Sequence, residues 1–131
     1  MIFERVVIVG VGLMGGSLGL ALKAHSLAGQ VIGLDRSAEA LTRAQARGAI
    51  DRGATDMEEA MRAADGIVIA LPVGQIPALL EALTPWVCPD ALVTDLGSVK
   101  AHIVEVGTRL LGARFVGGHP MAGSERSGIE A

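Results

Sequence analysis

The stretch Val6-Val7-Ile8-Val9-Gly10-Val11-Gly12-Leu13-Met14-Gly15 decides how the rest of the chain is organised. Its first four residues form an apolar run, which is typical of a buried parallel strand. After the last glycine, the spacing of the apolar residues predicts a helix with one shared face made of Met14, Leu18, Ala21 and Leu22. A strand, a glycine turn and a helix in this order predict a dinucleotide-binding unit.

Each glycine of this turn has a physical role. Gly10 allows the tight turn out of the strand, Gly12 has no Cβ to hold a pyrophosphate off the backbone, and Gly15 lets the helix pack close to the strand. The N–H groups at the helix start and the helix dipole then favour the phosphate charge. The expected pyrophosphate site therefore comprises Gly10, Gly12, Leu13, Met14 and Gly15.

A second apolar run, residues 30–34, leads to Asp35, which lies 20 residues after Gly15. At this position of a dinucleotide-binding unit, a carboxylate accepts hydrogen bonds from the hydroxyls of the adenosine ribose. A 2′-phosphate on that ribose would meet the same carboxylate, so the sequence favours NAD over NADP as cofactor. Arg36 is open to two interpretations, because it can pair with a 2′-phosphate or lie flat against the adenine; we expect the second.

The uncharged run over residues 6–22 also raises the possibility of a membrane helix or a secretion signal. Its small residues recur at the spacing of membrane helix pairs, as in Gly12/Gly16 and Gly15/Gly19. The run is shorter than the ~20 residues that a span needs. A signal peptide is disfavoured because Glu4 precedes Arg5 and no cleavage pattern follows. We expect no contact with a membrane.

Composition indicates one domain over residues 1–131 with an aliphatic core. Half of the residues are hydrophobic, but the aromatic ones are only Phe3, Trp86 and Phe115, which suits strands buried on both faces. The net charge of −3 argues against a nucleic-acid partner. Cys88 is the single cysteine, so no internal disulfide forms and a cytoplasmic location is expected. We see no metal-ligand spacing and expect no metal.

Strand and helix patterns alternate along the chain, which predicts an α/β fold with a doubly wound parallel sheet. The expected strands are residues 6–9, 30–34, 66–70, 91–94 and 114–116, in the spatial order third-second-first-fourth-fifth. Residues 49–52 are expected to be irregular. Ser37 and Asp56 are the expected N-caps of two helices, and Glu59 would complete a capping box. Leu71, Pro72 and Val73 follow the third strand at its carboxyl end, where we expect cofactor contacts.

His119 is the strongest candidate for a catalytic group, because it follows the last strand between glycines and a proline. A neutral imidazole can accept a hydroxyl proton as the same carbon loses hydride. A loop histidine held by the backbone is the alternative. Ser98 lies at the carboxyl end of another strand, where three roles are open to it: to orient His119, to bond the reacting hydroxyl, or simply to cap the next helix. Lys100, His25 and His102 are expected to be solvated.

Three motifs together resemble the prephenate/arogenate dehydrogenase family of tyrosine biosynthesis. They are Gly10-Val-Gly-Leu-Met-Gly-Gly-Ser-Leu18, Asp95-Leu-Gly-Ser-Val-Lys100 and Gly117-Gly-His-Pro-Met-Ala-Gly-Ser-Glu-Arg-Ser-Gly128. The last two are specific to the family, whereas the first is shared with other nucleotide-binding proteins. The resemblance runs through the whole chain but covers only the nucleotide-binding part of the family's enzyme. The family's C-terminal helical domain, which makes the homodimer, is absent from this sequence.

The resemblance implies an NAD-dependent oxidative decarboxylation of prephenate or arogenate. Hydride leaves C4 of the cyclohexadienol for NAD⁺, the hydroxyl becomes a carbonyl, CO₂ leaves and the ring becomes aromatic. His119 matches the histidine that polarises the C4 hydroxyl, and Ser98 matches the serine that holds that histidine and the hydroxyl. Ser124 and Glu125 match residues at the mouth of the substrate pocket. We expect the isolated 131-residue chain to bind cofactor without turning over substrate.

Two other functions are compatible with the glycine turn. A β-hydroxyacid dehydrogenase also opens with a glycine turn that carries Leu-Met-Gly, but it would use a later lysine, and its substrate motif lacks His-Pro. A non-catalytic NAD-binding module would need only the nucleotide site. The sequence does not distinguish prephenate from arogenate as substrate. The two differ in a side chain that, by the resemblance, is contacted largely by the absent domain.

Overall fold

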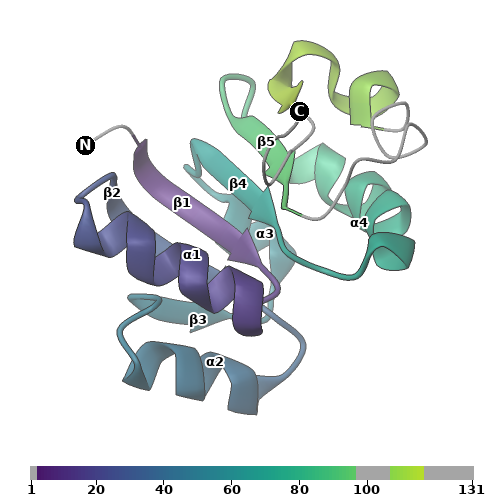
Figure 1. Ribbon diagram of the computed structural model, residues 1–131. Helices are drawn as coiled ribbons and strands as arrows, with labels where there is room; N and C mark the ends of the chain where they lie inside the picture. Colours follow the sequence, from purple (N-terminus) through teal and green to yellow (C-terminus); the bar gives the residue numbers. More distant parts are fainter. Residues whose placement is uncertain (1–2, 97–106, 117–131) are drawn as a thin grey trace, which may run out of the picture.

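A computed structural model describes residues 3–96 and 107–116 of the chain (Figure 1). The strands and helices alternate, and short 3₁₀ turns follow β4, α4 and the last helical segment. In chain order the elements are β1 (Phe3–Val9), α1 (Leu13–Ala24), β2 (Ala28–Leu34), α2 (Ala38–Ala46), β3 (Arg52–Ala54), α3 (Met57–Met61), β4 (Gly66–Ile69), η1 (Val73–Gln75), α4 (Ile76–Leu83), η2 (Thr84–Trp86), β5 (Leu92–Asp95), helical residues 107–111, η3 (Gly112–Arg114) and β6 (Phe115–Val116).

All six strands join one parallel sheet in the order β3-β2-β1-β4-β5-β6. The register aligns the strand ends: Val9 is paired with Leu34 of β2 and with Ile69 of β4, and Ile69 is paired with Asp95 of β5. The carboxyl ends of four strands therefore meet along one edge of the sheet. This is the Rossmann-like, doubly wound arrangement, in which ligands bind at that edge.

The predicted position of the third strand is wrong. The strand at residues 66–69 lies directly beside β1, whereas the sequence placed it beyond β2. The place beside β2 is instead taken by β3, a strand of three residues. It begins at the last residue of the stretch that was expected to be irregular, residues 49–52. β3 was missed because its three residues, Arg-Gly-Ala, contain no apolar run. Its Gly53 packs against Leu41, and a Cβ there would lie 2.9 Å from the Leu41 Cβ.

Helices cover both faces of the sheet, and a separate hydrophobic core lies on each face (Figure 1). α1 and α2 cover one face, over Val6 and Ile8 of β1. α3, α4 and the helical residues 107–111 pack on the other face, over Val7 and Val9 of the same strand. Successive residues of β1 thus point to opposite cores, as expected of a strand buried on both sides.

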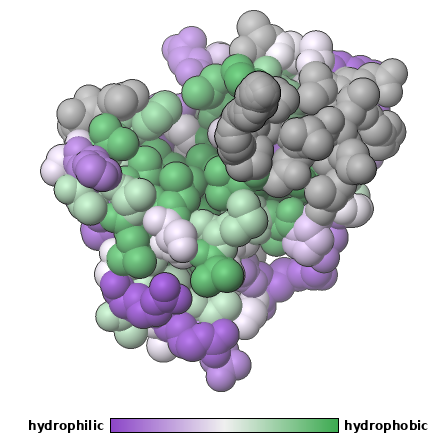
Figure 2. Space-filling view, viewed as in Figure 1, coloured by the Kyte–Doolittle hydropathy of each residue, from purple (hydrophilic) through white to green (hydrophobic). Residues whose placement is uncertain are grey.

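α1 packs mainly through glycines, and the apolar face that its spacing predicted is buried only in part. The buried residues of α1 are Gly15, Gly16, Gly19 and Leu22. Leu22 of that face is buried and Leu18 packs against the same core, whereas Met14 and Ala21 are exposed. Leu13 and Met14 at the start of α1 are exposed by 80% and 52%. Figure 2 shows hydrophobic surface on the side of the molecule that carries α1.

α1 has 12 residues. None of the helices in the described part of the chain has the length and hydrophobicity that a membrane span requires.

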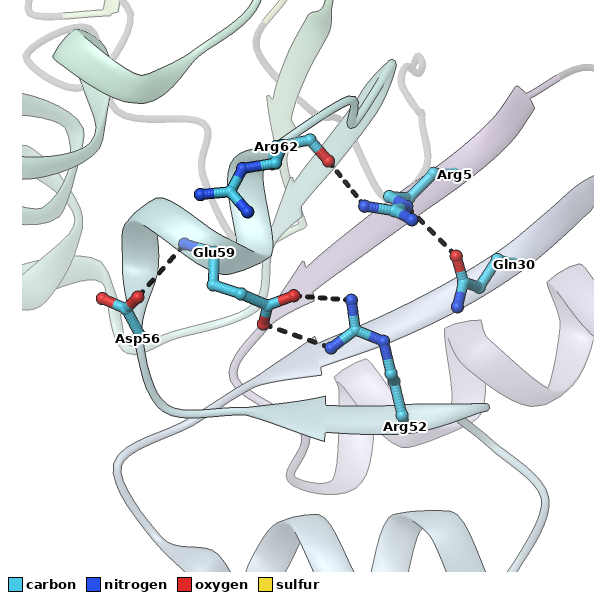
Figure 3. Close-up of polar contacts among 6 residues, drawn as sticks. All are labelled: Arg5, Gln30, Arg52, Asp56, Glu59 and Arg62. Atoms are coloured by element: carbon cyan, nitrogen blue, oxygen red, sulfur yellow. Dashed lines mark hydrogen bonds and ion pairs between the residues drawn. The ribbon is translucent and has the colours of Figure 1, made fainter.

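The caps at Ser37 and Asp56 are confirmed. The Ser37 hydroxyl accepts from the Ala40 N–H at 3.1 Å, and the Asp56 carboxylate accepts from the Glu59 N–H at 3.3 Å. Glu59, however, does not complete a capping box. Its carboxylate accepts two hydrogen bonds from the Arg52 guanidinium, at 3.1 and 2.7 Å (Figure 3). This bidentate pair joins the start of β3 to α3.

The Arg52–Glu59 pair predicts a pH-dependent stability. The Arg52 guanidinium lowers the pKa of the Glu59 carboxyl. A lowered pKa in the folded state stabilises the fold above the unfolded pKa of about 4.3, and this stabilisation disappears as the pH falls through the folded pKa. Both side chains are more than a third exposed, so Glu59→Gln should cost only about 0.2–1 kcal/mol at pH 7.

Urea unfolding of wild type and Glu59→Gln at pH 7 and at pH 3 measures this effect. The difference between the two proteins should be present at pH 7 and shrink at pH 3. Glu58→Gln is the matched control, because Glu58 is an exposed neighbour on the same helix, and it should show no such difference. An equal cost of Glu59→Gln at both pH values would contradict the prediction.

Candidate functional site

The glycine turn after β1 requires glycine at two positions for reasons of space. Gly10 has φ +92°, and a Cβ there would lie 2.6 Å from the Ala70 carbonyl oxygen. A Cβ on Gly15 would lie 2.0 Å from the Gly10 carbonyl oxygen. Neither contact can be relieved by rotating a side chain, since backbone atoms are involved. The turn therefore brings α1 against the ends of β1 and β4.

Gly12 is different, because a Cβ there would meet nothing within 4 Å. Gly12 is the N-cap of α1, and it provides no side-chain hydrogen bond to the first turn of the helix. The N–H groups at the start of an α-helix have no partner within the helix and carry the positive end of its dipole. The space beside Gly12 is thus open to an anion at the helix start.

Asp35 follows β2 at the same edge of the sheet, and its carboxylate is half-buried. One oxygen, Oδ2, accepts a hydrogen bond from the Val11 N–H at 3.1 Å. The other, Oδ1, accepts from the Ser37 N–H at 2.9 Å. Since each carboxylate oxygen has two lone pairs, both retain capacity for a further donor such as a ligand hydroxyl.

A pocket of about 700 Å³ lies at this edge, between the ends of β1, β2 and β4 and the helices α3 and α4. Four residues that the sequence predicted as cofactor contacts line it: Asp35, Arg36, Leu71 and Pro72. The predicted residue Val73 begins the 3₁₀ turn η1, directly after them. The predicted glycines do not line the pocket: Gly10 and Gly12 lie in the turn between β1 and α1, and Gly15 lies in the first turn of α1. Val9, the last residue of β1, does line it.

The sequence missed several residues of the pocket. Thr55 follows β3, and it was missed because β3 itself was missed. Gln75 and Leu79 come from the start of the next helical region, where their spacing indicated only a helix. The complete set of lining residues that the sequence had not assigned to the site is Val9, Leu34, Thr55, Met57, Gly74, Gln75, Ala78 and Leu79.

The four residues predicted to contact substrate lie outside the described residues. They are Ser98, His119, Ser124 and Glu125. Their predicted roles therefore stay predictions. Ser98 comes three residues after Asp95, which ends β5 at the same edge of the sheet and is fully buried. Among the residues that the structure does describe, no group of three or more His, Cys, Asp or Glu side chains could hold a metal ion.

Together these features match the parts of a nucleotide. The open start of α1 suits a phosphate, the Asp35 carboxylate suits a ribose diol, and the pocket offers a largely apolar lining to a flat base. The parts lie along one edge of the sheet because the register aligns the ends of β1, β2 and β4.

Known proteins are similar to this chain in sequence and fold. Residues 18–131 match the family model described as "Prephenate dehydrogenase, nucleotide-binding domain". The prephenate dehydrogenase of Bacillus subtilis (strain 168) is 38% identical over 98% of this chain and 35% of its own length. The chain thus spans about a third of that relative.

Two solved structures are also similar. The prephenate dehydrogenase of Aquifex aeolicus, in complex with hydroxyphenyl propionate and NAD⁺, superposes with a TM-score of 0.84 and 38% identity, over 92% of this chain and 43% of that one. The arogenate dehydrogenase of Synechocystis gives a TM-score of 0.83 and 34% identity, over 92% and 42%. The family match covers most of the chain, and the fold agrees with it. The chain belongs to the prephenate dehydrogenase nucleotide-binding domain family.

Proposed function

We propose that this chain is the NAD⁺-binding part of an enzyme that oxidises prephenate or arogenate with loss of CO₂. The observation that carries the proposal is the pairing of two features at one sheet edge, the uncapped start of α1 and the Asp35 carboxylate. The pyrophosphate would lie against Gly12 and the helix start, and the adenosine ribose against Asp35. The adenine would enter the pocket beside Arg36 and Leu71. The NAD⁺ bound to the Aquifex aeolicus relative supports this choice of cofactor.

A preference for NAD⁺ over NADP⁺ follows from the charge of Asp35. The carboxylate accepts hydrogen bonds from ribose hydroxyls but repels a 2′-phosphate. Calorimetric titration of the chain with each cofactor tests the proposal, and NAD⁺ should bind more tightly. Asp35→Ala should weaken NAD⁺ binding by about 1.5–3 kcal/mol, the scale of a hydrogen bond to a charged group. Equal or tighter binding of NADP⁺ by the wild type would contradict the proposal.

The proposed reaction assigns the substrate side to residues that the sequence singled out. Hydride passes from C4 of the cyclohexadienol to NAD⁺, while His119 accepts the proton of the C4 hydroxyl. The ring carboxylate leaves as CO₂ and its electrons complete the aromatic ring. Ser98 would hold His119 and the hydroxyl, with Ser124 and Glu125 at the pocket mouth. Similarity to both a prephenate and an arogenate dehydrogenase supports either substrate.

A β-hydroxyacid dehydrogenase domain and a non-catalytic NAD-binding module share the nucleotide site with the proposed enzyme. The match to the prephenate dehydrogenase family favours the proposed enzyme over both. Turnover of a simple hydroxyacid would favour the first alternative. The non-catalytic module is tested by combining this chain with the remaining domain of a relative. If that preparation bound NAD⁺ but oxidised neither prephenate nor arogenate, the non-catalytic module would be favoured.

A further inference from the structure

We infer that Asp35 has a second role, which is to hold the glycine turn in the shape that binds pyrophosphate. This inference rests on the proposed function, because it concerns the same NAD⁺ site. In the expected role, the carboxylate only accepts hydrogen bonds from the hydroxyls of the adenosine ribose. In the second role, its loss would weaken binding of the pyrophosphate even if those hydroxyls were missing.

The backbone of the turn is tied to two consecutive residues at the end of β2. The Gly10 N–H donates to the Leu34 carbonyl oxygen at 2.8 Å, and the Val11 N–H donates to the Asp35 carboxylate at 3.1 Å. The second bond is charge-assisted, a type about twice as strong as a neutral hydrogen bond. The two bonds fix the position of the residues directly before Gly12, where α1 begins.

The Val11 side chain completes the attachment. It is 5% exposed, and it packs over Gly33 of β2, where a Cβ would lie 2.7 Å from a Val11 methyl carbon. Because the Val11 N–H donates to the Asp35 carboxylate, it is not available to a phosphate. The amides that remain for the pyrophosphate are those after Gly12, and Asp35 therefore sets which donors face the ligand.

The other carboxylate oxygen is held as well. The Ser37 N–H donates to Asp35 Oδ1 at 2.9 Å, and Ser37 in turn caps α2. Each oxygen thus has one amide donor. An asparagine at this position has only one acceptor oxygen, and its amide group would face one of the two N–H donors. Asp35→Asn should consequently release the turn, although it keeps the size of the side chain.

A NAD⁺ analogue whose adenosine ribose lacks the 2′ and 3′ hydroxyls separates the two roles. Calorimetry measures the binding of NAD⁺ and of this analogue to wild type, Asp35→Ala and Asp35→Asn. If Asp35 holds the turn, both variants bind the analogue about 3- to 10-fold more weakly than the wild type does, the fold-change for one lost hydrogen bond. Equal affinity of the three proteins for the analogue would overturn the inference.

Asp51→Ala is the matched control. Asp51 also accepts a backbone hydrogen bond, from the Val31 N–H at 2.7 Å, and it pairs with Lys23. Because Val31 precedes the pocket-lining end of β2, this control should lower stability without changing the affinity for either ligand. An equal loss of analogue affinity in Asp51→Ala and Asp35→Ala would mean general destabilisation and would overturn the inference.

Amide hydrogen exchange in the unliganded chain provides an independent readout. The Val11 amide should exchange faster in Asp35→Ala and Asp35→Asn than in the wild type, whereas the Ile8 amide in β1 should not change. Unchanged Val11 exchange in both variants would overturn the inference. Failure of the proposed function has a different signature, because the wild type would then bind no NAD⁺ while the exchange of Val11 would still respond to Asp35.

Discussion

Gly12→Val is expected to abolish NAD⁺ binding while the protein stays folded. A valine side chain would fill the space through which the pyrophosphate approaches the start of α1. The fold should survive, because a Cβ on Gly12 meets nothing within 4 Å and its φ of −72° is open to other residues. Valine is a poorer N-cap than glycine, a loss on the order of 1 kcal/mol. Calorimetry measures NAD⁺ binding, and circular dichroism with urea measures folding.

Gly15→Val provides the contrast within the same motif. Its Cβ would lie 2.0 Å from the Gly10 carbonyl oxygen and 3.1 Å from an Ile8 methyl carbon. Overpacking of this kind typically costs about 1–3 kcal/mol and occasionally more, so this variant should lose stability. Gly12→Val should lose binding and Gly15→Val should lose stability. A folded Gly12→Val protein with wild-type affinity for NAD⁺ would remove the basis of the proposed nucleotide site.

His119→Asn is expected to lower kcat by roughly 10²–10⁴, the usual contribution of a general base. Asparagine keeps a hydrogen-bonding group of similar size but cannot accept the proton of the C4 hydroxyl. The affinity for NAD⁺ should hardly change, because the proposed contacts of His119 are to substrate. Steady-state kinetics and calorimetry, on a preparation with prephenate or arogenate dehydrogenase activity, measure the two quantities.

His25→Asn is the control for this experiment. His25 is exposed at the C-cap of α1, well away from the strand ends that line the pocket. Its replacement should leave kcat and the affinity for NAD⁺ at their wild-type values. If His119→Asn also kept kcat within a few-fold of the wild type, His119 would not be the proton acceptor.

The parts of the fold that depend on local patterns were predictable. A few neighbouring residues are enough to recognise the apolar run of β1, the glycines after it and Asp35 after β2. The structure places the glycine turn and Asp35 together at the carboxyl ends of the strands. The caps at Ser37 and Asp56 are equally local, since each accepts from an N–H three residues on.

The parts that depend on distant residues were not predictable. Glu59 has the spacing of a capping box, but its carboxylate binds Arg52, which belongs to a strand that shows no apolar run. Because that strand was not predicted, β4 was assigned to the wrong place in the sheet and Thr55 was not recognised as a pocket residue. The close packing at Gly15 was predicted from the glycine motif, but the packing at Gly19 was not, because a Cβ there would lie 2.2 Å from the carbonyl oxygen of Ala49, which is distant in the sequence.

Titration of the ¹⁵N-labelled 131-residue chain with NAD⁺, followed by amide chemical shifts, tests whether the chain binds this cofactor at the proposed site. We expect saturable shifts at Gly12 and Leu13, at Asp35 and at Leu71. We expect no shifts at the amino ends of the strands, where the Asp65 carboxylate accepts hydrogen bonds from the amides at the start of β1. The absence of saturable shifts, or shifts gathered around Asp65, would contradict the proposal that this chain binds NAD⁺.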